Sequence, residues 1–281
     1  MLSYRHAFHA GNHADVLKHA VFVFLLRYLV QKDKPFWCID THAGAARYDL
    51  TTGYAAKNAE YETGISRLWT RTDLPGMLAD YVRQVRALNP DGKLRSYPGS
   101  PQLALPLLRK QDRLRLFELH STETELLQEF ARENGHRVLA QAGDGFIGLQ
   151  SLLPPPSRRA LVLIDPSYED KNDYKRVLTA LREAMRRFDT GVYAVWYPQV
   201  QRPESHRFPE LLKGLQSKDW LHVTLRVKAP VAGGLGLHGS GMFILNPPWT
   251  LPAALRSVMP YLVEVLGQDD HAGFELEFET A

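Results

Sequence analysis

Hydrophobic and polar residues form two kinds of run along this chain, short apolar runs and longer runs with helical spacing. The short runs predict strands at residues 36–39, 113–118, 137–142, 160–164, 192–196, 221–227 and 242–245. The longer runs predict helices at residues 13–31, 123–134, 146–153, 174–188 and 204–216, and Asn12 is a suitable N-cap for the first. Because strands and helices alternate, the pattern predicts an α/β fold with a mostly parallel, doubly wound sheet.

Two parts of the chain depart from this alternation. The last two predicted strands are separated only by the glycine-rich residues 233–241, which predicts an antiparallel hairpin at one edge of the sheet. Residues 40–112, between the first two strands, are too many for one crossover connection. Helical patterns at 61–71 and 78–88 occur there. We therefore expect a small helical insertion at 49–94 and a core formed by residues 1–48 and 95–281.

The composition is that of an ordinary globular protein with a sizeable core. Of 281 residues, 44% are hydrophobic and 23% are charged, and the single Cys38 excludes an internal disulfide framework. The apolar stretch at 20–30 is too short for a membrane span and contains Arg27, and no cleavable signal is recognisable. These features predict a cytoplasmic protein. A net charge of +3 permits a nucleic-acid partner without requiring one.

The residues after the predicted strand at 160–164 point to a specific chemistry. The exocyclic amine of a base is a poor nucleophile, because its lone pair is delocalised into the ring, until acceptors hold its hydrogens. Asp165 supplies a carboxylate, Pro166 supplies a main-chain carbonyl, and Tyr168 supplies a ring to stack on the base. Open α/β sheets bind ligands at the carboxyl ends of their strands, where this turn lies. The simpler interpretation is a strand followed by an ordinary proline turn.

Acidic residues and glycines also follow the other predicted strands. The turn at 40–44 follows the first strand, Glu118 ends the second, Asp144 lies between two glycines after the third, and Asp165 follows the fourth. An acid at the end of the second strand is well placed to pair with ribose hydroxyls. Together these residues predict a nucleoside-type ligand. A nicotinamide dinucleotide is disfavoured, because the first turn lacks the Gly-x-Gly-x-x-Gly string.

Several motifs together resemble a known family. Residues 165–168 resemble the Asp-Pro-Pro-Tyr signature of adenine-N6 methyltransferases, and residues 4–19 closely resemble the start of the RlmJ family of bacterial 23S ribosomal RNA adenine-N6 methyltransferases. The resemblance continues through residues 40–44, 97–101, 144–145, 196–198, 240–242 and 246–249. It implies the Rossmann-like fold of class I S-adenosylmethionine-dependent methyltransferases. It also implies S-adenosylmethionine as methyl donor, 23S ribosomal RNA as partner, and neither a membrane nor an obligate protein partner.

The resemblance also implies roles for individual residues. Asp165, Pro166 and Tyr168 would form the catalytic turn, with Asp165 holding the N6 amine of an adenine and accepting its proton. Tyr4, His6 and Lys18 would lie near the substrate. Contacts to the methyl donor would come from His19, His42, Ser100, Glu118, Asp144, Gly145 and Asp165. Among these, Glu118 would accept from the ribose hydroxyls and Asp144 from the amino group of the donor, while His19 and His42 would hold its methionine end.

Two details qualify the resemblance. Ser167 replaces the second proline of the signature, which removes a bias of Pro166 towards extended backbone. We expect the acceptors to remain and only rigidity to be lost. Residues 246–249, Asn-Pro-Pro-Trp, also resemble an amine-methyltransferase signature. Because they follow the last predicted strand, we interpret them as a structural turn in which Trp249 is packed.

Other interpretations remain open from the sequence alone. His9 and His13 have the spacing of zinc ligands, but no third ligand is evident and we expect no metal site. We interpret a group of basic residues as the solvated face of a helix, namely Lys175, Arg176, Arg182, Arg186 and Arg187. The spacing of Arg182 and Arg186 also leaves phosphate contacts open. The strand-end motifs are equally compatible with DNA-adenine or protein-amide methylation. The change at Ser167 also leaves a non-catalytic nucleotide-binding module conceivable.

Overall fold

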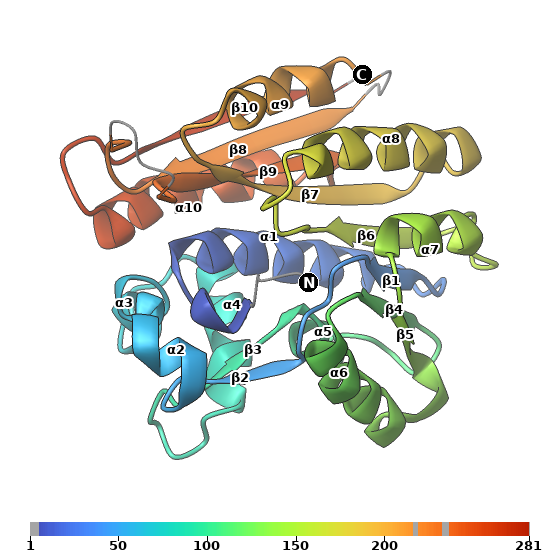
Figure 1. The fold of residues 1–281 in the computed structure, drawn as a ribbon, viewed down its shortest axis with the longest axis horizontal. Helices are drawn as coiled ribbons and strands as arrows, with labels where there is room; N and C mark the ends of the chain where they lie inside the picture. The colour runs from blue at the N-terminus through green and yellow to red at the C-terminus, as the bar shows by residue number, and fades with distance from the viewer. Residues whose placement is uncertain (1–5, 216–218, 232–235, 281) are drawn as a thin grey trace.

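The computed structural model describes residues 6–215, 219–231 and 236–280. A large mixed sheet runs through the molecule with helices on both of its faces (Figure 1). Its strands lie in the order β10-β8-β9-β7-β6-β1-β4-β5. They are β1 (Trp37–Asp40), β4 (Arg113–Glu118), β5 (Val138–Ala142), β6 (Ala160–Ile164), β7 (Val192–Gln199), β8 (Trp220–Arg226), β9 (Gly239–Leu245) and β10 (Gly273–Glu279).

The strand directions confirm the predicted mostly parallel sheet and correct one detail. Strands β5, β4, β1, β6 and β7 are parallel, and β9 pairs antiparallel with both β7 and β8. The β8–β9 hairpin is therefore present, but it does not form the edge of the sheet. The edge is β10, which pairs antiparallel with β8 and was not predicted. All of its residues remain at least partly exposed, so its hydrophobic signal is weak.

Helices cover the sheet in two layers. On one face α1 packs against β6, β7 and β9, and α10 packs against β8 and β10. On the other face α7, α8 and α9 pack in series. Strand β6 is buried at all five positions because both faces are covered. The helices of the core are α1 (His13–Leu29), α5 (Ser100–Ala104), α6 (Ser121–Glu133), α7 (Gly145–Leu152), α8 (Asn172–Arg187), α9 (Pro203–Lys213) and α10 (Leu251–Leu266).

The segment predicted as a helical insertion does contain helices. They are α2 (Gly53–Asn58), α3 (Ser66–Trp69) and α4 (Gly76–Ala87), with the 3-10 helix η2 (Glu60–Thr63). A small antiparallel sheet of β2 (Arg47–Asp49) and β3 (Ser96–Pro98), not predicted from the sequence, brackets them. Because α4 packs against α1, the insertion shares a hydrophobic interior with the core. Its status as a separate subdomain at 49–94 stays a prediction.

Helix α1 is buried along most of its length. Asn12 caps it as predicted, since its side chain accepts from the backbone N–H groups of Ala14 and Asp15 at 2.9 and 3.0 Å. Its polar side chains Asp15, Lys18 and His19 are buried together with its apolar ones. The remaining short 3-10 helices are η1 (His6–Phe8) and η3 (Gly135–Arg137). No helix within the described ranges is long and apolar enough to cross a membrane.

Candidate active site

A cavity lies along the carboxyl ends of β1, β4, β5 and β6, where a parallel sheet brings its strand-end residues together. Every residue that the family resemblance assigned to the methyl donor lines it. These residues are His19, His42, Ser100, Glu118, Asp144, Gly145 and Asp165. Pro166, His6 and Lys18 line it as well. We call this space the first cavity.

Glycines let backbone segments approach one another around the first cavity. A side chain at Gly145 would collide with the main-chain carbonyl of Thr41, and one at Gly99 with that of Ala45. Gly44 adopts a φ of +58°, a conformation that side-chain-bearing residues rarely take. The loops after β1 and β5 therefore pack closely enough to form one continuous wall.

Glu118 and Asp144 organise this wall through their carboxylates. Glu118 accepts from the N–H of Gly44 at 2.8 Å and from the N–H groups of Leu119 and His120 at 2.7 Å each. Asp144 caps α7 by accepting from the N–H of Phe146 at 2.9 Å, and it also pairs with Arg176. Arg176 thus lies at the cavity rather than on a purely solvated helix face, which corrects the sequence interpretation.

His19 and His42 are neutral in this environment. Burial lowers the pKa of each to about 3, because a protonated imidazole is poorly solvated there. His19 Nδ1 lies 2.7 Å from the Tyr97 hydroxyl, and His42 Nδ1 lies 2.8 Å from the Thr41 hydroxyl. Both rings are thereby fixed in orientation as uncharged hydrogen-bonding groups.

Asp40 supports the cavity from behind and was missed as an individual site residue. It is 1% exposed, and it accepts from the Ser100 hydroxyl at 2.5 Å and from the N–H of His42 at 3.2 Å. Burial raises the pKa of Asp40 to about 7, although these two hydrogen bonds act in the opposite direction. Its position at the end of β1 was the available signal, since the predicted turn began with it.

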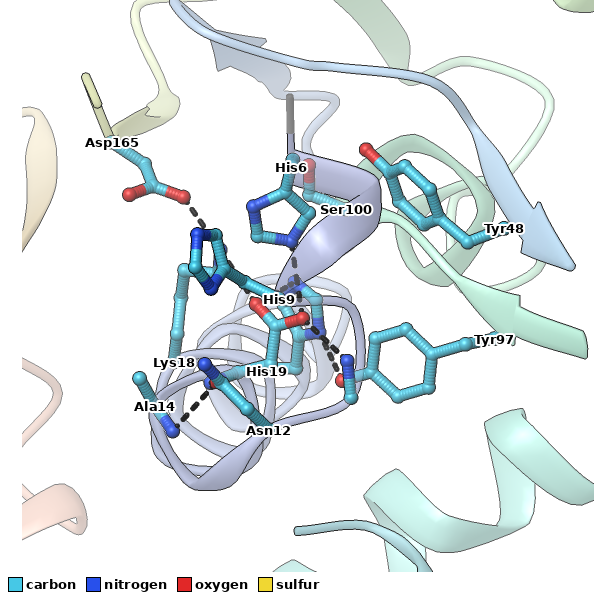
Figure 2. Close-up of polar contacts among 12 residues, drawn as sticks. His6, His9, Asn12, Ala14, Lys18, His19, Tyr48, Tyr97, Ser100 and Asp165 are labelled. Carbon is cyan, nitrogen blue, oxygen red and sulfur yellow. Dashed lines mark hydrogen bonds and ion pairs between the residues drawn. The ribbon is translucent and has the colours of Figure 1, made fainter. Parts of the chain in front are cut away.

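Asp165 lies where the first cavity meets a second one. Its Oδ2 is 2.5 Å from Lys18 Nζ, and Figure 2 shows Lys18 reaching from α1 towards it with His6 nearby. Burial raises the pKa of Asp165, while Lys18 and His6 act in the opposite direction. Lys18 is only 5% exposed, yet its pKa is raised, because the effect of Asp15 and Asp165 exceeds that of burial. The Lys18–Asp165 contact is therefore an ion pair.

The second cavity opens on the other side of Asp165. His6, Lys18, Asp165 and Ser167 belong to the walls of both cavities. The rest of the second wall includes an aromatic ring and two cationic side chains, namely Trp196, Arg202 and Lys228. A ligand in each cavity would therefore meet the other at Asp165.

Tyr168 packs in the aromatic core beside the second cavity, and its role in stacking on the base stays a prediction. The ring is 2% exposed and packs against Tyr174 and Phe208 at centroid distances of 4.5 and 6.0 Å. Its hydroxyl donates to the main-chain carbonyl of Trp196 at 2.7 Å. Tyr168 also has a φ of +54°, a backbone conformation that residues with a side chain rarely adopt. It also lines the second cavity. Tyr4 lies outside the described residues.

Residues 246–249 form a structural turn beside the start of β7, at the end of the sheet opposite the first cavity. Asn246 Nδ2 donates to the carbonyls of Asp189 and Gly191 at 2.6 and 2.7 Å, which occupies the side chain fully as a donor. The expectation that Trp249 is packed is wrong, since this residue is 78% exposed. Among the described residues, no group of three or more His, Cys, Asp and Glu side chains could hold a metal ion. His9 contacts Glu60 at 3.0 Å instead.

Comparisons with known proteins agree with one another. The family described as "Ribosomal RNA large subunit methyltransferase D, RlmJ" matches residues 33–280. A relative from Escherichia coli (strain K12), ribosomal RNA large subunit methyltransferase J, is 47% identical over 263 residues, 93% of each chain. Its namesake from Haemophilus influenzae is 43% identical over 281 residues, covering 100% of this chain and 99% of its own. A crystal structure of a Legionella pneumophila protein superposes with a TM-score of 0.89 at 37% identity, covering 96% of this chain and 98% of the other.

Proposed function

The chain belongs to the RlmJ family of ribosomal RNA large subunit methyltransferases, and we propose that it methylates the exocyclic N6 amine of one adenine in 23S ribosomal RNA. The methyl donor is S-adenosylmethionine, and the fold is the Rossmann-like fold of class I methyltransferases. The observation that carries the proposal is the position of Asp165 at the junction of two cavities. This position allows one carboxylate to reach a ligand in either cavity.

The first cavity fits the methyl donor by its charge. Five carboxylates line it, namely Glu118, Glu123, Asp144, Asp165 and Asp173, and they outnumber the cationic side chains there, which include Lys18 and Arg176. Such a wall attracts amino and hydroxyl donors and a cationic ligand, and it disfavours a pyrophosphate. S-adenosylmethionine, when bound, supplies a methyl group on a positively charged sulfonium.

Individual side chains provide the acceptors that this ligand needs. We assign Glu118 to the ribose hydroxyls and Asp144 to the adenine amino group of the donor. His19 and His42, neutral through burial, would hold the methionine end together with Ser100. Glu118 is already held by three backbone N–H groups, so it binds the ribose without having to reorganise.

Asp165 and Pro166 are the residues that hold the substrate amine. An adenine N6 amine is uncharged at neutral pH, so no base is required before attack. The Asp165 carboxylate and the Pro166 carbonyl accept its hydrogens and aim its lone pair towards the first cavity. After methyl transfer the amine carries an extra proton, which Asp165 accepts. A carboxylate whose pKa is raised by burial is a better acceptor for this proton than an exposed one.

The second cavity would hold the target nucleotide. To enter it the adenine must leave its stack, at a cost of about a few kcal/mol, or must already be single-stranded. Arg202 and Lys228 on its wall would attract the phosphates that flank the base. His6 and Lys18 lie beside Asp165 on this path, and we assign Tyr4 to the same substrate region. Ribosomal RNA as substrate would place the enzyme in the cytoplasm.

Methyl transfer to unmodified large-subunit RNA tests this proposal. Radiolabelled S-adenosylmethionine should label 23S RNA that lacks its natural methyl groups, and a nucleoside digest should show N6-methyladenosine. DNA of matched adenine content and a bulk protein fraction are the controls. Labelling of DNA or protein in place of RNA would overturn the substrate assignment, and labelling of none of them would favour a non-catalytic module.

A further inference from the structure

Asp15 is a buried carboxylate that contacts His6 and Lys18 and has no part in the proposed reaction. It lies in the first turn of α1 and is 2% exposed. Its Oδ2 accepts from the N–H of Gly11 at 2.9 Å and from His6 Nε2 at 3.1 Å. Its Oδ1 lies 2.9 Å from Lys18 Nζ. Asp15 thus contacts both residues that stand beside Asp165 and belong to the walls of the two cavities.

Lys18 is shared between two carboxylates. Its ammonium lies 2.9 Å from Asp15 and 2.5 Å from Asp165, and it stands 5.6 Å above the ring of Trp196. Lys18 therefore occupies an oxygen of Asp165 that can otherwise accept a hydrogen of the substrate amine. A buried ammonium that lost its only partner would be costly, so Lys18 can release Asp165 only if a second anion holds it.

We propose that Asp15 is a positioning residue that retains the Lys18 ammonium and the His6 imidazole while Asp165 turns to the substrate amine. The inference rests on the proposed function, because it concerns the residue that receives the amine. Asp15 has no place on the wall of the first cavity, so it acts without touching the methyl donor. It lines the second cavity, behind Lys18 and His6.

The charges around Asp15 give the proposal a measurable signature. The titratable groups that face Asp15 include His6 from η1, His13, Lys18 and His19 from α1, Tyr81 from α4, Tyr97 from β3, and Asp165 at the end of β6. Although burial alone would raise it, His6 and Lys18 hold the pKa of Asp15 well below its usual range. The charge of Asp15 in turn raises the pKa of Asp165. Removing the charge of Asp15 should lower the pKa of Asp165. Lys18 should then pair with Asp165 alone.

The first test compares Asp15→Asn with wild type under saturating RNA. We expect kcat to fall by about 10- to 100-fold, because Lys18 then competes with the amine for Asp165. The Kd for S-adenosylmethionine should stay within about twofold of wild type, and the acid limb of the pH–kcat profile should move to lower pH. Asp112→Asn is the matched control, a buried aspartate in an ion pair with Arg109 away from both cavities. Asp112→Asn should lower Tm without shifting the acid limb of the pH–kcat profile.

A double-mutant cycle with Lys18→Met separates positioning from stability. If Asp15 acts through Lys18, adding Asp15→Asn to Lys18→Met should change kcat by less than about threefold. The double variant removes both charges together, so it keeps the test available if Asp15→Asn alone does not fold. A further loss above that threshold, or a folded Asp15→Asn with wild-type kcat and an unmoved acid limb, would overturn the inference. Absence of N6-methyladenosine with wild type would instead refute the proposed function.

Discussion

The carboxyl ends and the amino ends of the parallel strands carry similar residues and use them differently. We call these two sides of the main sheet the carboxyl edge and the opposite edge. At the carboxyl edge, Asp40 and Asp165 are buried carboxylates whose pKa values are raised, and Asp165 faces two cavities. At the opposite edge, Asp112 precedes β4 and is held by Arg109, which lowers its pKa despite burial, and Asn246 donates to two carbonyls. Asp112 and Asn246 thus have their hydrogen-bonding partners within the protein. Asp165 in contrast faces two cavities, where its carboxylate can accept from a ligand.

The contrast matters because both edges present an amine-methyltransferase-like turn. Residues 165–168 and 246–249 each begin with an acceptor side chain followed by proline. Strand β9 runs antiparallel to β7, so its end lies beside the start of β7, away from the end of β6. The direction of one strand therefore decides which turn reaches the cavities. A signature string of this kind indicates an active site only where the sheet places it beside the cavities.

The largest effect should come from Asp165→Asn. We expect methyl transfer to fall by about 10²- to 10⁴-fold, because the amine loses an anionic acceptor for its proton. Asn246→Ala, measured beside it, should retain most of the activity and lose stability, because two carbonyls lose their donor. Initial rates on 23S RNA, with circular dichroism to verify folding, measure both. The reverse order of activities would move the active site to the opposite edge.

Cofactor binding should respond next most strongly, through Glu118→Gln. The variant keeps the side-chain shape but removes the charge that would pair with the ribose hydroxyls, a contact of about 1.5–3 kcal/mol. Calorimetry should therefore show S-adenosylmethionine binding weakened by about 10- to 100-fold. An unchanged affinity in a folded variant would remove Glu118 from the donor site.

Stability should depend on pH in opposite directions at the two edges. The folded-state pKa of Asp40 is about 7, above its ordinary value, so its contribution is complete at low pH and is lost as pH rises through about 7. Asp112 has a lowered pKa, so its contribution is present above its ordinary value and is lost in acid. Relative to wild type, Asp40→Asn should gain stability from about pH 5 to about pH 8. Asp112→Asn should lose its disadvantage below about pH 4. Chemical denaturation of both variants and of wild type across this pH range would measure these differences. Equal pH dependences of the two variants would contradict the assignment.

The smallest effect should come from Ser167→Pro. The substitution restores the backbone bias at Pro166 and leaves both acceptors in place, so the rate should stay the same or rise by about threefold at most. Single-turnover kinetics on 23S RNA would measure it. Loss of activity in a folded variant would show that Ser167 has a role of its own at the junction of the two cavities.

Much of the fold followed from local pattern. The five parallel strands and the N-cap at Asn12 were predicted because their signals lie in contiguous residues. Strand β10 was missed because all of its residues are at least partly exposed, and β2 and β3 because they have three residues each. All three strands gain their stability from pairing partners far along the chain. The sequence motifs placed the first cavity at the correct strand ends. They could not show that Tyr168 turns inwards, or that Asp15 lies behind Lys18, because both depend on side-chain direction.

A crystal structure with S-adenosylhomocysteine and adenosine 5′-monophosphate bound together would test the central claim most directly. We expect S-adenosylhomocysteine in the first cavity, with its ribose at Glu118. The adenine of the nucleotide should lie in the second cavity, with its N6 amine within hydrogen-bonding distance of Asp165 and of the Pro166 carbonyl. An adenine bound at Asn246, or an amine directed away from Asp165 while both cavities are filled, would contradict it.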